Sequence, residues 1–317
     1  MSIYITIDGG TTNTRLSLIK DGAYLGSVKS NVGARRSIDG KDLLKKEIAS
    51  GIRQLLQNHA LQEKDVSCII ASGMITSEFG LCQLEHLQTP AGLAELHAGM
   101  QRMELVEITS IPFFFVLGTN LDAANFEKFD VMRGEETELM GIWEEAYGDC
   151  IYVLPGSHSK VIKVDQEGRV VDFFTMLTGE MIGALSSQTI LKDAVDLSAS
   201  EICEKYLLSG YDYAVREGIN KALFKVRILK NFFGCDRNAV YSFFLGAVLS
   251  AEIGSIIGDG AQSVVIGGRK QIRQAMAILL NHRSDKRVVL LDDLSVERST
   301  ALGAIRIYQN DSQCVIH

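Results

Sequence analysis

Near its start the chain reads Ser2-Ile-Tyr-Ile-Thr-Ile-Asp8-Gly9-Gly10-Thr11-Thr12-Asn13-Thr14-Arg15. The pattern predicts a strand over residues 2–8, a polar turn and a second strand over residues 14–20. Glycines let backbone N–H groups approach an anion closely, and Thr and Asn side chains add hydrogen-bond donors. An Asp at the strand end can hold a hydrated Mg²⁺ beside phosphates. Taken alone, the stretch fits a polar hairpin as well as a phosphate-binding loop.

The composition is that of a globular protein and disfavours several functional classes. The chain has 317 residues, 46% of them hydrophobic and 22% charged, and this length predicts two domains of about 150 residues. A net charge of −7, with no basic cluster, argues against nucleic-acid and anionic-membrane partners. The six cysteines lack metal-ligand spacing, which indicates thiols in a reducing compartment. Because a strand begins at once, without a signal-peptide pattern, we expect a cytoplasmic protein.

The pattern of the first 30 residues returns in the middle of the chain. It reads Ile151-Tyr-Val-Leu-Pro155-Gly156-Ser157-His158-Ser159-Lys160 and continues into Val161 and beyond. A third strand follows in each copy, over residues 23–30 and 170–176, and helices and strands then alternate. The repeat predicts an α/β fold of two similar domains, at residues 1–148 and 149–317.

The two glycine turns suggest a nucleotide held by both domains. The first turn would bind the γ-phosphate with Mg²⁺, and the second would bind the β-phosphate through backbone amides and Ser157. His158 and Lys160 would add positive charge, although each also fits a solvated turn residue. The sequence has no GxxxxGK[ST] loop and no GxGxxG after a strand, which disfavours P-loop enzymes and dinucleotide oxidoreductases.

Two further segments suit a nucleotide. Thr178 could cap the helix that follows it, and helix N-termini attract anions. Gly267 and Gly268 follow a buried strand, where missing side chains would let a flat ring such as adenine approach the backbone. Each signal is weak alone, because many strand-to-helix turns use the same residue types.

The segment between the two copies carries the densest chemistry. It reads Val131-Met-Arg133-Gly-Glu135-Glu136-Thr-Glu138 and is predicted to open a helix. Acids in a first turn suit the helix dipole, and we interpret Glu138, Glu144 and Glu145 as surface acids. A carboxylate near a bound alcohol could accept its proton during phosphoryl transfer. Glu135 is preferred over Glu136, but the sequence leaves both open, and Arg133 could bind a carboxylate or a phosphate with its fork.

Together these motifs resemble the 2-dehydro-3-deoxygalactonokinase family. The resemblance covers roughly residues 3–310 and includes Asp8–Asn13, Ala71–Thr76, Val131–Thr137, Leu154–Lys160 and Phe174–Glu180. It implies two RNase H-like domains, the actin-like ATPase and sugar kinase fold, around an interdomain ATP cleft. It also implies transfer of the ATP γ-phosphate to the 6-hydroxyl of 2-dehydro-3-deoxy-D-galactonate, a step of galactonate catabolism, with ATP and Mg²⁺ as cofactors.

Residue chemistry and resemblance together give the candidate sites. The catalytic candidates are Asp8, Glu135 and Glu136, and Asp8 is also the candidate metal ligand. The candidates for ATP binding are Gly10, Thr11, Thr12, Asn13, Gly156, Ser157, His158, Lys160, Thr178, Gly179, Gly267 and Gly268. The candidates for substrate binding are Arg15, Arg36, Gly73, Met74 and Arg133. An acceptor carboxylate needs a cation, for which Arg36 and Arg133 are preferred and Arg15 is third.

Two departures from the family pattern leave the substrate open. Family members commonly carry Trp where this chain has Gly9, which could open the acceptor site, and the single tryptophan is Trp143. The turn over residues 291–298 lacks a glycine-aspartate pair. Alternatives are a kinase of another sugar or sugar acid, a phosphatase on this fold, or a non-catalytic, nucleotide-switched, sugar-responsive protein. The sequence shows no helix-turn-helix for a DNA-linked regulator, and it leaves open whether the chain forms a homodimer.

Overall fold

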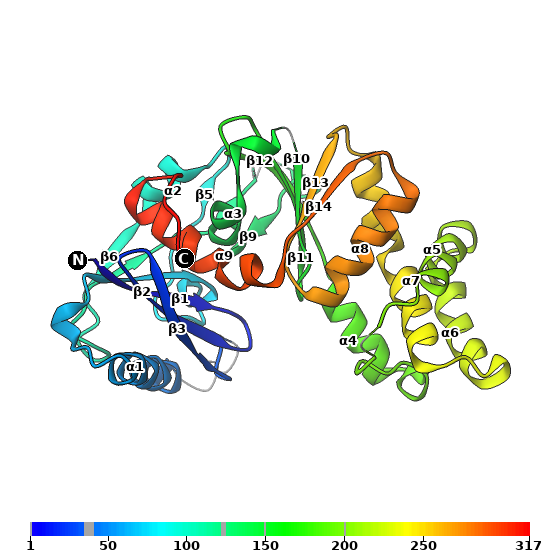
Figure 1. Ribbon diagram of the computed structural model, residues 1–317, viewed down its shortest axis with the longest axis horizontal. Coiled ribbons are helices and arrows are strands. Elements are labelled where there is room, and N and C mark those ends of the chain that lie inside the picture. The colour runs from blue at the N-terminus through cyan, green and yellow to red at the C-terminus, as the bar shows by residue number, and fades with distance from the viewer. Residues whose placement is uncertain (1, 35–40, 122–124, 149, 200) are drawn as a thin grey trace. The chain divides into compact units, whose positions relative to one another are not determined.

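The computed structural model describes residues 2–34, 41–121, 125–148, 150–199 and 201–317. Contacts divide the chain into two compact units. Unit 1 consists of Met1–Ala146, Asp165–Asp172 and Leu294–His317, and unit 2 consists of Tyr147–Val164 and Phe173–Asp293. The chain is shown in Figure 1.

Unit 1 is built on a six-stranded sheet with the order β3-β2-β1-β4-β7-β6. Its strands are β1 (Ile3–Gly9), β2 (Thr14–Lys20), β3 (Ala23–Ser30), β4 (Cys68–Gly73), β6 (Gln101–Met103) and β7 (Phe113–Phe115). The first three strands form antiparallel hairpins, whereas β4 runs parallel to β1 and β7 runs parallel to β4. A small second sheet joins β5 (Leu87–Gln88), β8 (Thr119–Asn120) and β9 (Val131–Met132).

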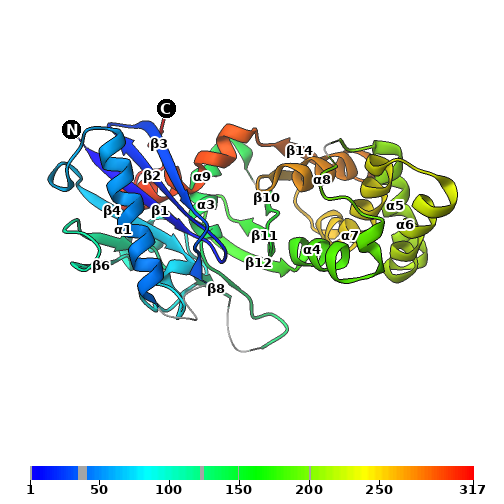
Figure 2. The same ribbon diagram turned by 90° about the horizontal axis from the view of Figure 1, so that it is seen from below.

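Helices cover both faces of the large sheet, because strand side chains alternate between the faces. On one face, helix α1 (Lys41–Asn58) packs Leu44 and Ile48 into a core with Ile5 and Ile7. On the other face lies α9 (Asp293–Gln309), whose Tyr308 ring contacts the rings of Tyr4 and Phe114 at centroid distances of 5.7 and 5.0 Å. Figure 2 shows α1 lying along the sheet. Unit 1 also contains α2 (Leu93–Gly99) and α3 (Glu135–Ile142).

Unit 2 contains a five-stranded sheet with the order β12-β11-β10-β13-β14. Its strands are β10 (Cys150–Leu154), β11 (Ser159–Val164), β12 (Val170–Met176), β13 (Ser263–Ile266) and β14 (Arg287–Leu290). Its helices are α4 (Thr178–Gln188), α5 (Glu204–Glu217), α6 (Ile219–Phe233), α7 (Arg237–Gly258) and α8 (Lys270–Arg283). Helices α5, α6 and α7 pack side by side (Figure 2).

The two sheets share one topology. In each, three antiparallel strands are followed by two strands that run parallel to the first, so the central order is third, second, first, fourth and fifth. The repeat predicted from the sequence is therefore confirmed. Short 3₁₀ turns lie at Glu63–Asp65, Met74–Thr76, Glu145–Tyr147 and Ile190–Asp193.

Helix α7 is the central helix of unit 2. Its mean hydropathy of 1.7 and its length would allow it to cross a membrane, but 72% of that apolar window is buried inside the protein. Glycines let it pack tightly on α5, since a Cβ at Gly246 would lie 2.1 Å from the Leu207 carbonyl oxygen. These contacts identify α7 as a core helix.

Two sequence predictions differ from the structure. The predicted helix over residues 92–103 ends at Gly99, and residues 101–103 form the edge strand β6. The predicted second domain, residues 149–317, does not include the C-terminal helix, because residues 294–317 belong to unit 1. Glycine contacts explain this: a Cβ at Gly303 of α9 would lie 1.8 Å from the Thr137 carbonyl oxygen of α3.

Candidate active site

The first candidate loop connects β1 to β2 and has a closed shape. The Gly10 N–H donates to the Asn13 carbonyl at 2.9 Å. Gly33 packs against the loop so closely that a Cβ there would lie 2.5 Å from the Asn13 nitrogen. The Thr11 and Thr12 side chains are exposed. The loop therefore combines a fixed backbone with hydroxyl groups that a ligand can reach.

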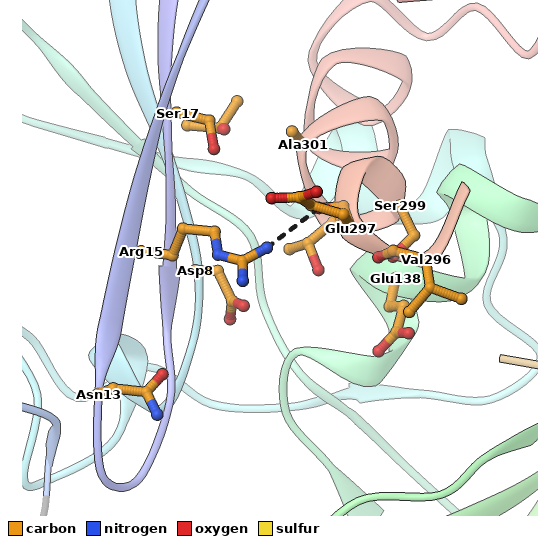
Figure 3. Close-up of a pocket in the computed structure, with 11 residues that line it drawn as sticks. Asp8, Asn13, Arg15, Ser17, Glu138, Val296, Glu297, Ser299 and Ala301 are labelled. Atoms are coloured by element: carbon orange, nitrogen blue, oxygen red, sulfur yellow. Dashed lines mark hydrogen bonds between the residues drawn. The ribbon is translucent and has the colours of Figure 1, made fainter. Parts of the chain in front are cut away.

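A polar pocket of about 150 Å³ lies beside this loop in unit 1. Figure 3 shows Arg15 reaching from β2 toward the first turns of α9, where it donates to the Glu297 carbonyl at 3.2 Å. Asp8 and Arg15 are cross-strand partners, and so are Thr6 and Ser17, which places all four on this face of the sheet. Glu138 of α3 and Ser299 of α9 complete much of the wall.

Asp8 is the acid of the pocket that comes from the end of β1. Burial raises the pKa of its carboxyl, the Arg15 and Lys29 cations lower that pKa, and Glu135 raises it again. Among the described residues, no three His, Cys, Asp or Glu side chains are grouped for a metal ion. A Mg²⁺ held by Asp8 would take its other ligands from water and phosphate, which matches the usual preference of this ion.

The structure separates the two adjacent acids at the start of α3. Glu136 is fully buried, and its two carboxylate oxygens accept the Gly134 N–H at 2.8 and 2.9 Å. Burial and the neighbouring Glu135 raise the pKa of Glu136 to about 7. Glu135 is half-buried, accepts the Arg133 N–H at 3.0 Å, and lies close enough to Asp8 to influence its pKa. Of these two acids, Glu135 is the one whose carboxylate acts on Asp8.

The structure contradicts the prediction that Glu138 is a surface acid. It is half-buried, lines the pocket, and has a pKa raised to about 8. Burial is the largest cause, followed by repulsion from Asp8 and Glu135, while the Ser299 hydroxyl lowers the pKa. Glu144 and Glu145 are exposed, as the sequence predicted.

Three glycines bring the chain segments of this site into direct contact. A Cβ at Gly134 would lie 3.0 Å from the Gly73 Cα, and a Cβ at Gly73 would lie 2.6 Å from the Gly9 carbonyl oxygen. Both Gly134 and Gly73 adopt positive φ, at 114° and 85°. A Cβ at Gly9 would lie 2.6 Å from the Cβ of Ile75, so Gly9 does not open a space beside the loop. Met74 is half-buried and opens the 3₁₀ turn after Gly73.

Arg133 holds the segment after this turn. Its Nη1 donates to the carbonyl and hydroxyl oxygens of Thr76 at 2.7 and 2.6 Å. Its Nη2 donates to the Leu84 carbonyl at 3.0 Å and lies 3.0 Å from the Nε2 of His86. Burial and the Arg133 charge lower the pKa of His86 to about 4, so this ring is neutral at neutral pH. The fork predicted to bind an acceptor carboxylate is therefore occupied by the protein itself.

Arg15 and Arg36 are the two other arginines that the sequence suggested for the acceptor carboxylate. Arg15 lines the polar pocket and uses one guanidinium nitrogen on a backbone carbonyl. Arg36 lies outside the described residues. Arg15, third in the sequence prediction, is thus the described arginine with donors left for a ligand in the pocket.

The second candidate loop connects β10 to β11 in unit 2. Gly156 and Ser157 are half-buried, and His158 is exposed and pairs with Glu180 at 3.2 Å. Lys160 lies on β11, 5% exposed, with its ammonium donating to the Thr175 hydroxyl and lying over the Phe173 ring. It is therefore a buried strand residue and not part of the turn.

A buried acid stabilises the second loop. Glu252 of α7 is 1% exposed and accepts hydrogen bonds from the hydroxyls of Ser159 and Thr178, the latter at 2.5 Å. Burial raises the pKa of Glu252, and these two hydroxyls lower it. Thr178 thus bonds to α7 and makes no side-chain cap for α4. Gly179 lets α4 approach the loop, since a Cβ there would lie 2.2 Å from the Gly156 carbonyl oxygen.

The glycine pair after β13 also lies against the second loop. Gly267 donates its N–H to the Val153 carbonyl at 2.9 Å. Gly268 has a φ of 67°, and a Cβ there would lie 2.4 Å from the Pro155 carbonyl oxygen. The next residue, Arg269, donates from Nη2 to the Ser157 hydroxyl at 3.0 Å. Unit 2 therefore brings residues 155–158, 178–179 and 267–269 together.

Three residues of these sites were missed in the sequence. Glu138 lies three positions after Glu135, so a helix places the two on one face. Glu252 is a lone acid in an apolar helix, a pattern that indicates a paired buried group. Arg269 carries no comparable signal, because its contact with residue 157 spans 112 positions.

The chain is similar to known proteins over most of its length. The family model described as DGOK, 2-keto-3-deoxy-galactonokinase, matches residues 8–303. The chain is 26% identical over 254 residues to the 2-dehydro-3-deoxygalactonokinase of Escherichia coli (strain K12), covering 80% of each chain. It is 32% identical over 198 residues to a Rhizobium meliloti (strain 1021) protein named probable 2-dehydro-3-deoxygalactonokinase DgoK1, covering 61% of this chain and 59% of that one.

Solved structures show the fold. A protein from Sinorhizobium meliloti assigned as a 2-dehydro-3-deoxygalactonokinase superposes with a TM-score of 0.77 at 23% identity, over 96% of each chain. The activator of the 2-hydroxyisocaproyl-CoA dehydratase from Clostridium difficile gives a TM-score of 0.52 at 13% identity, covering 97% of this chain and 95% of that one. The fold is that of actin-like ATPases and sugar kinases. By its match over nearly the whole length, the chain belongs to the 2-keto-3-deoxy-galactonokinase family.

Proposed function

We propose that this protein transfers the γ-phosphoryl group of ATP to the 6-hydroxyl of 2-dehydro-3-deoxy-D-galactonate, giving the 6-phosphate and ADP. Family membership supports the reaction class and the substrate class. The proposal rests mainly on the position of Glu135, which is half-buried and lies near Asp8. Asp8 itself lies at the end of β1, the strand that precedes the glycine-threonine loop. Phosphoryl transfer to an alcohol needs such a carboxylate beside a phosphate-binding loop.

In the proposed reaction Glu135 is the general base. Its carboxylate accepts the proton of the 6-hydroxyl as that oxygen forms a bond to the γ-phosphorus. The bond from the γ-phosphorus to the bridging oxygen breaks, and the electron pair leaves on ADP. Glu136 is less suited because the Gly134 N–H occupies both of its oxygens. Glu138, with a pKa of about 8, keeps its proton near neutral pH and is a poor base there.

The phosphates of ATP are proposed to bind to the glycine turns. In unit 1 these are Gly10 to Asn13, whose exposed threonine hydroxyls supply donors. Asp8 would hold Mg²⁺, which when bound neutralises phosphate charge. In unit 2 the proposed contacts are the Gly156 and Ser157 amides and the start of α4 at Thr178 and Gly179, where free N–H groups favour anions. Gly267 and Gly268 are proposed to face the adenosine.

The acceptor is proposed to bind in unit 1, in reach of Glu135. Arg15 is the proposed partner of its carboxylate, because the guanidinium is presented to the pocket. Gly73 and Met74 would contact the sugar chain from the turn after β4. Arg133 is proposed to act indirectly, by fixing the segment from Thr76 to His86.

Release of ADP with different acceptors tests the function. We expect turnover with 2-dehydro-3-deoxy-D-galactonate, and none with a neutral hexose such as galactose or without an acceptor. Turnover with galactose alone would contradict a sugar-acid substrate. Release of ADP at the same rate without an acceptor would instead indicate a phosphatase or a nucleotide switch.

The cellular setting is also a proposal. We place the reaction in the cytoplasm, as part of galactonate breakdown, because that is where ATP and a sugar-acid intermediate would meet. Restored growth on galactonate, in a bacterial strain lacking its own 2-dehydro-3-deoxygalactonokinase, would support this role. A strain that makes the protein in soluble form but still fails to grow would contradict it.

A further inference from the structure

Unit 1 contains a second pocket, of about 370 Å³, built from residues other than those around Asp8. Its walls come from α2, the end of α3, the turn between β11 and β12, and α9. Pockets of small-molecule sites typically have volumes of about 300 to 1,000 Å³. The cavity is therefore large enough for a compact metabolite.

One wall of this pocket includes a buried arginine that forms no ion pair with a carboxylate of the described residues. Arg306 is 8% exposed, and its Nε donates to the Cys314 carbonyl at 3.0 Å. Its Nη1 donates to the Met140 carbonyl at 2.9 Å and to the Trp143 carbonyl at 3.3 Å. Within the part of the chain that the structure describes, no acceptor or ion pair engages Nη2. Burial lowers the pKa of Arg306, and the carboxylates of Glu144 and Asp311 oppose this from a distance without pairing with the guanidinium. A buried cation is costly unless an anion engages it directly, so this nitrogen points to an anionic ligand.

The other charges of the pocket are already engaged. Arg169 pairs with Asp165 at 2.8 Å and approaches Glu167 at 3.6 Å. Glu95 accepts the Gly92 N–H at 2.9 Å. The hydrogen bond from Asp165 is the main cause that raises the pKa of Arg169, and Glu167 and Glu95 add to it. Of the two arginines among the described residues that line the pocket, Arg306 is thus the one without an ion pair. Because Glu95 and Glu167 also line the cavity, a ligand with one negative charge fits better than one with two.

Another part of the pocket lining is apolar and aromatic. Trp143, the single tryptophan of the chain, lines the pocket with Met140 and Leu93. Its ring is held in place by Gly168, where a Cβ would lie 2.5 Å from the ring. A rigid indole presents a surface on which a flat or apolar group can stack.

We propose that this pocket binds a small organic monocarboxylate. The carboxylate accepts hydrogen bonds from the Nη2 of Arg306, and the flat or apolar part of the molecule packs on Trp143. The site lies at the end of α3 opposite Glu135, since Arg306 bonds to the last carbonyls of that helix. It is separate from the residues proposed for ATP and the acceptor.

Trp143 provides a direct readout, because it is the only tryptophan. Benzoate is titrated into the full-length protein, and benzamide serves as a neutral molecule of the same shape. We expect a saturable change in tryptophan emission with benzoate, and affinity for benzamide weaker by about tenfold or more, since a charge-assisted hydrogen bond is lost. No saturable change, or an equal affinity for benzamide, would overturn the proposal.

Two variants and one competitor locate the binding. Arg306→Gln removes the cation, and Ala94→Phe fills the pocket from the exposed side of α2 without touching the Arg306 bonds. Each is expected to weaken benzoate binding by about tenfold or more. If Arg306→Gln fails to fold, Ala94→Phe decides the question, and unchanged affinity in that variant contradicts the site. Saturating ADP should leave benzoate binding unchanged, whereas displacement by ADP would assign benzoate to the nucleotide site.

Discussion

The hairpins β1–β2 and β10–β11 have the same construction but different support. Each is a strand, a glycine turn and an antiparallel strand, and each turn is packed by a glycine from a later segment, Gly33 or Gly179. In the first hairpin the acid, Asp8, faces a pocket with charged neighbours. The second hairpin contains no such acid in its turn; instead Glu252 of helix α7 lies buried beneath it, and the hydroxyl groups of Ser159 and Thr178 engage its oxygens.

The two hairpins share one framework, but the acid at the first is placed for chemistry, whereas the acid beneath the second is placed to stabilise the structure. An acid that faces a pocket can bind a metal or act on a substrate; burial raises the pKa of Asp8, and the nearby Arg15 and Lys29 cations oppose that rise. An acid enclosed by hydroxyl donors can only hold segments in place. We therefore expect substitutions near the first hairpin to change turnover, and those beneath the second to change stability and nucleotide affinity.

The largest effect is expected from Glu135→Gln. Loss of the proton acceptor should lower kcat by about 10²- to 10⁴-fold, the usual contribution of a general base. The midpoint of thermal unfolding and the affinity for ATP should stay nearly unchanged, because Glu135 is only half-buried. Glu144→Gln, at an exposed acid of the same segment, is the matched control. Full turnover in Glu135→Gln would remove this residue from the chemistry.

Glu252→Leu should affect stability most. The hydroxyls of Ser159 and Thr178 would lose their acceptor in a buried place, at a cost of about 1–3 kcal/mol for each group. Urea unfolding measures this loss, and the KM for ATP should rise more than kcat falls because the second loop is less fixed. Glu252→Gln keeps one acceptor oxygen, so its free energy of unfolding should lie between that of the unsubstituted protein and that of Glu252→Leu. Equal stability of all three would show that the buried acid does not support the loop.

The acids of unit 1 predict a pH dependence of stability. Below about pH 4.5 the Glu138 carboxyl is protonated in both the folded and the unfolded chain. As the pH rises to about 8, the unfolded chain loses the proton while the folded protein keeps it, so the free energy of unfolding falls. Glu138→Gln should reduce this slope and stabilise the protein at pH 8 by about 1 kcal/mol or more, the value of one pKa unit. The measurement is urea unfolding between pH 5 and 8 in EDTA, and parallel profiles for the two proteins would contradict the assignment.

The smallest effect is expected from His158→Gln. The pair between His158 and Glu180 is exposed, and such pairs contribute about 0–1 kcal/mol. Thermal unfolding should hardly change, and the KM for ATP should rise by less than about tenfold, the equivalent of 1.4 kcal/mol. A much larger rise in KM for ATP, without loss of stability, would indicate that His158 binds a phosphate group directly.

Much of the fold follows from local sequence patterns. Alternation and turn residues place the first three strands of unit 1, and strand β12 of unit 2, within one residue of their observed ends. The repeat predicts that the two sheets share one order of strands. The position of α9 could not be predicted, because the glycine contact between residues 303 and 137 joins distant parts of the chain. For the same reason the domain boundary predicted at residue 149 assigned the last helix to the wrong unit.

The candidate site was predictable by residue type but not by contact. The sequence identified Asp8 and the acids of α3, yet only the backbone bonds of Gly134 show that Glu136 turns inward. It proposed Arg133 as a carboxylate ligand, but the carbonyls that occupy its fork lie about 50 residues away, at Thr76 and Leu84. Whether a charged group is free or engaged depends on such distant partners, which local patterns do not encode.

The contact between Gly9 and Ile75 has a consequence for how this protein can diverge from its relatives. A side chain at residue 9 would collide with the Cβ of Ile75, an atom that cannot swing away as the end of a long side chain can. An aromatic residue at position 9 therefore requires a shift of the turn or a smaller residue at position 75. Among homologous sequences the two positions should covary, so that the residue after the first aspartate and the residue after Met74 are inherited as a pair.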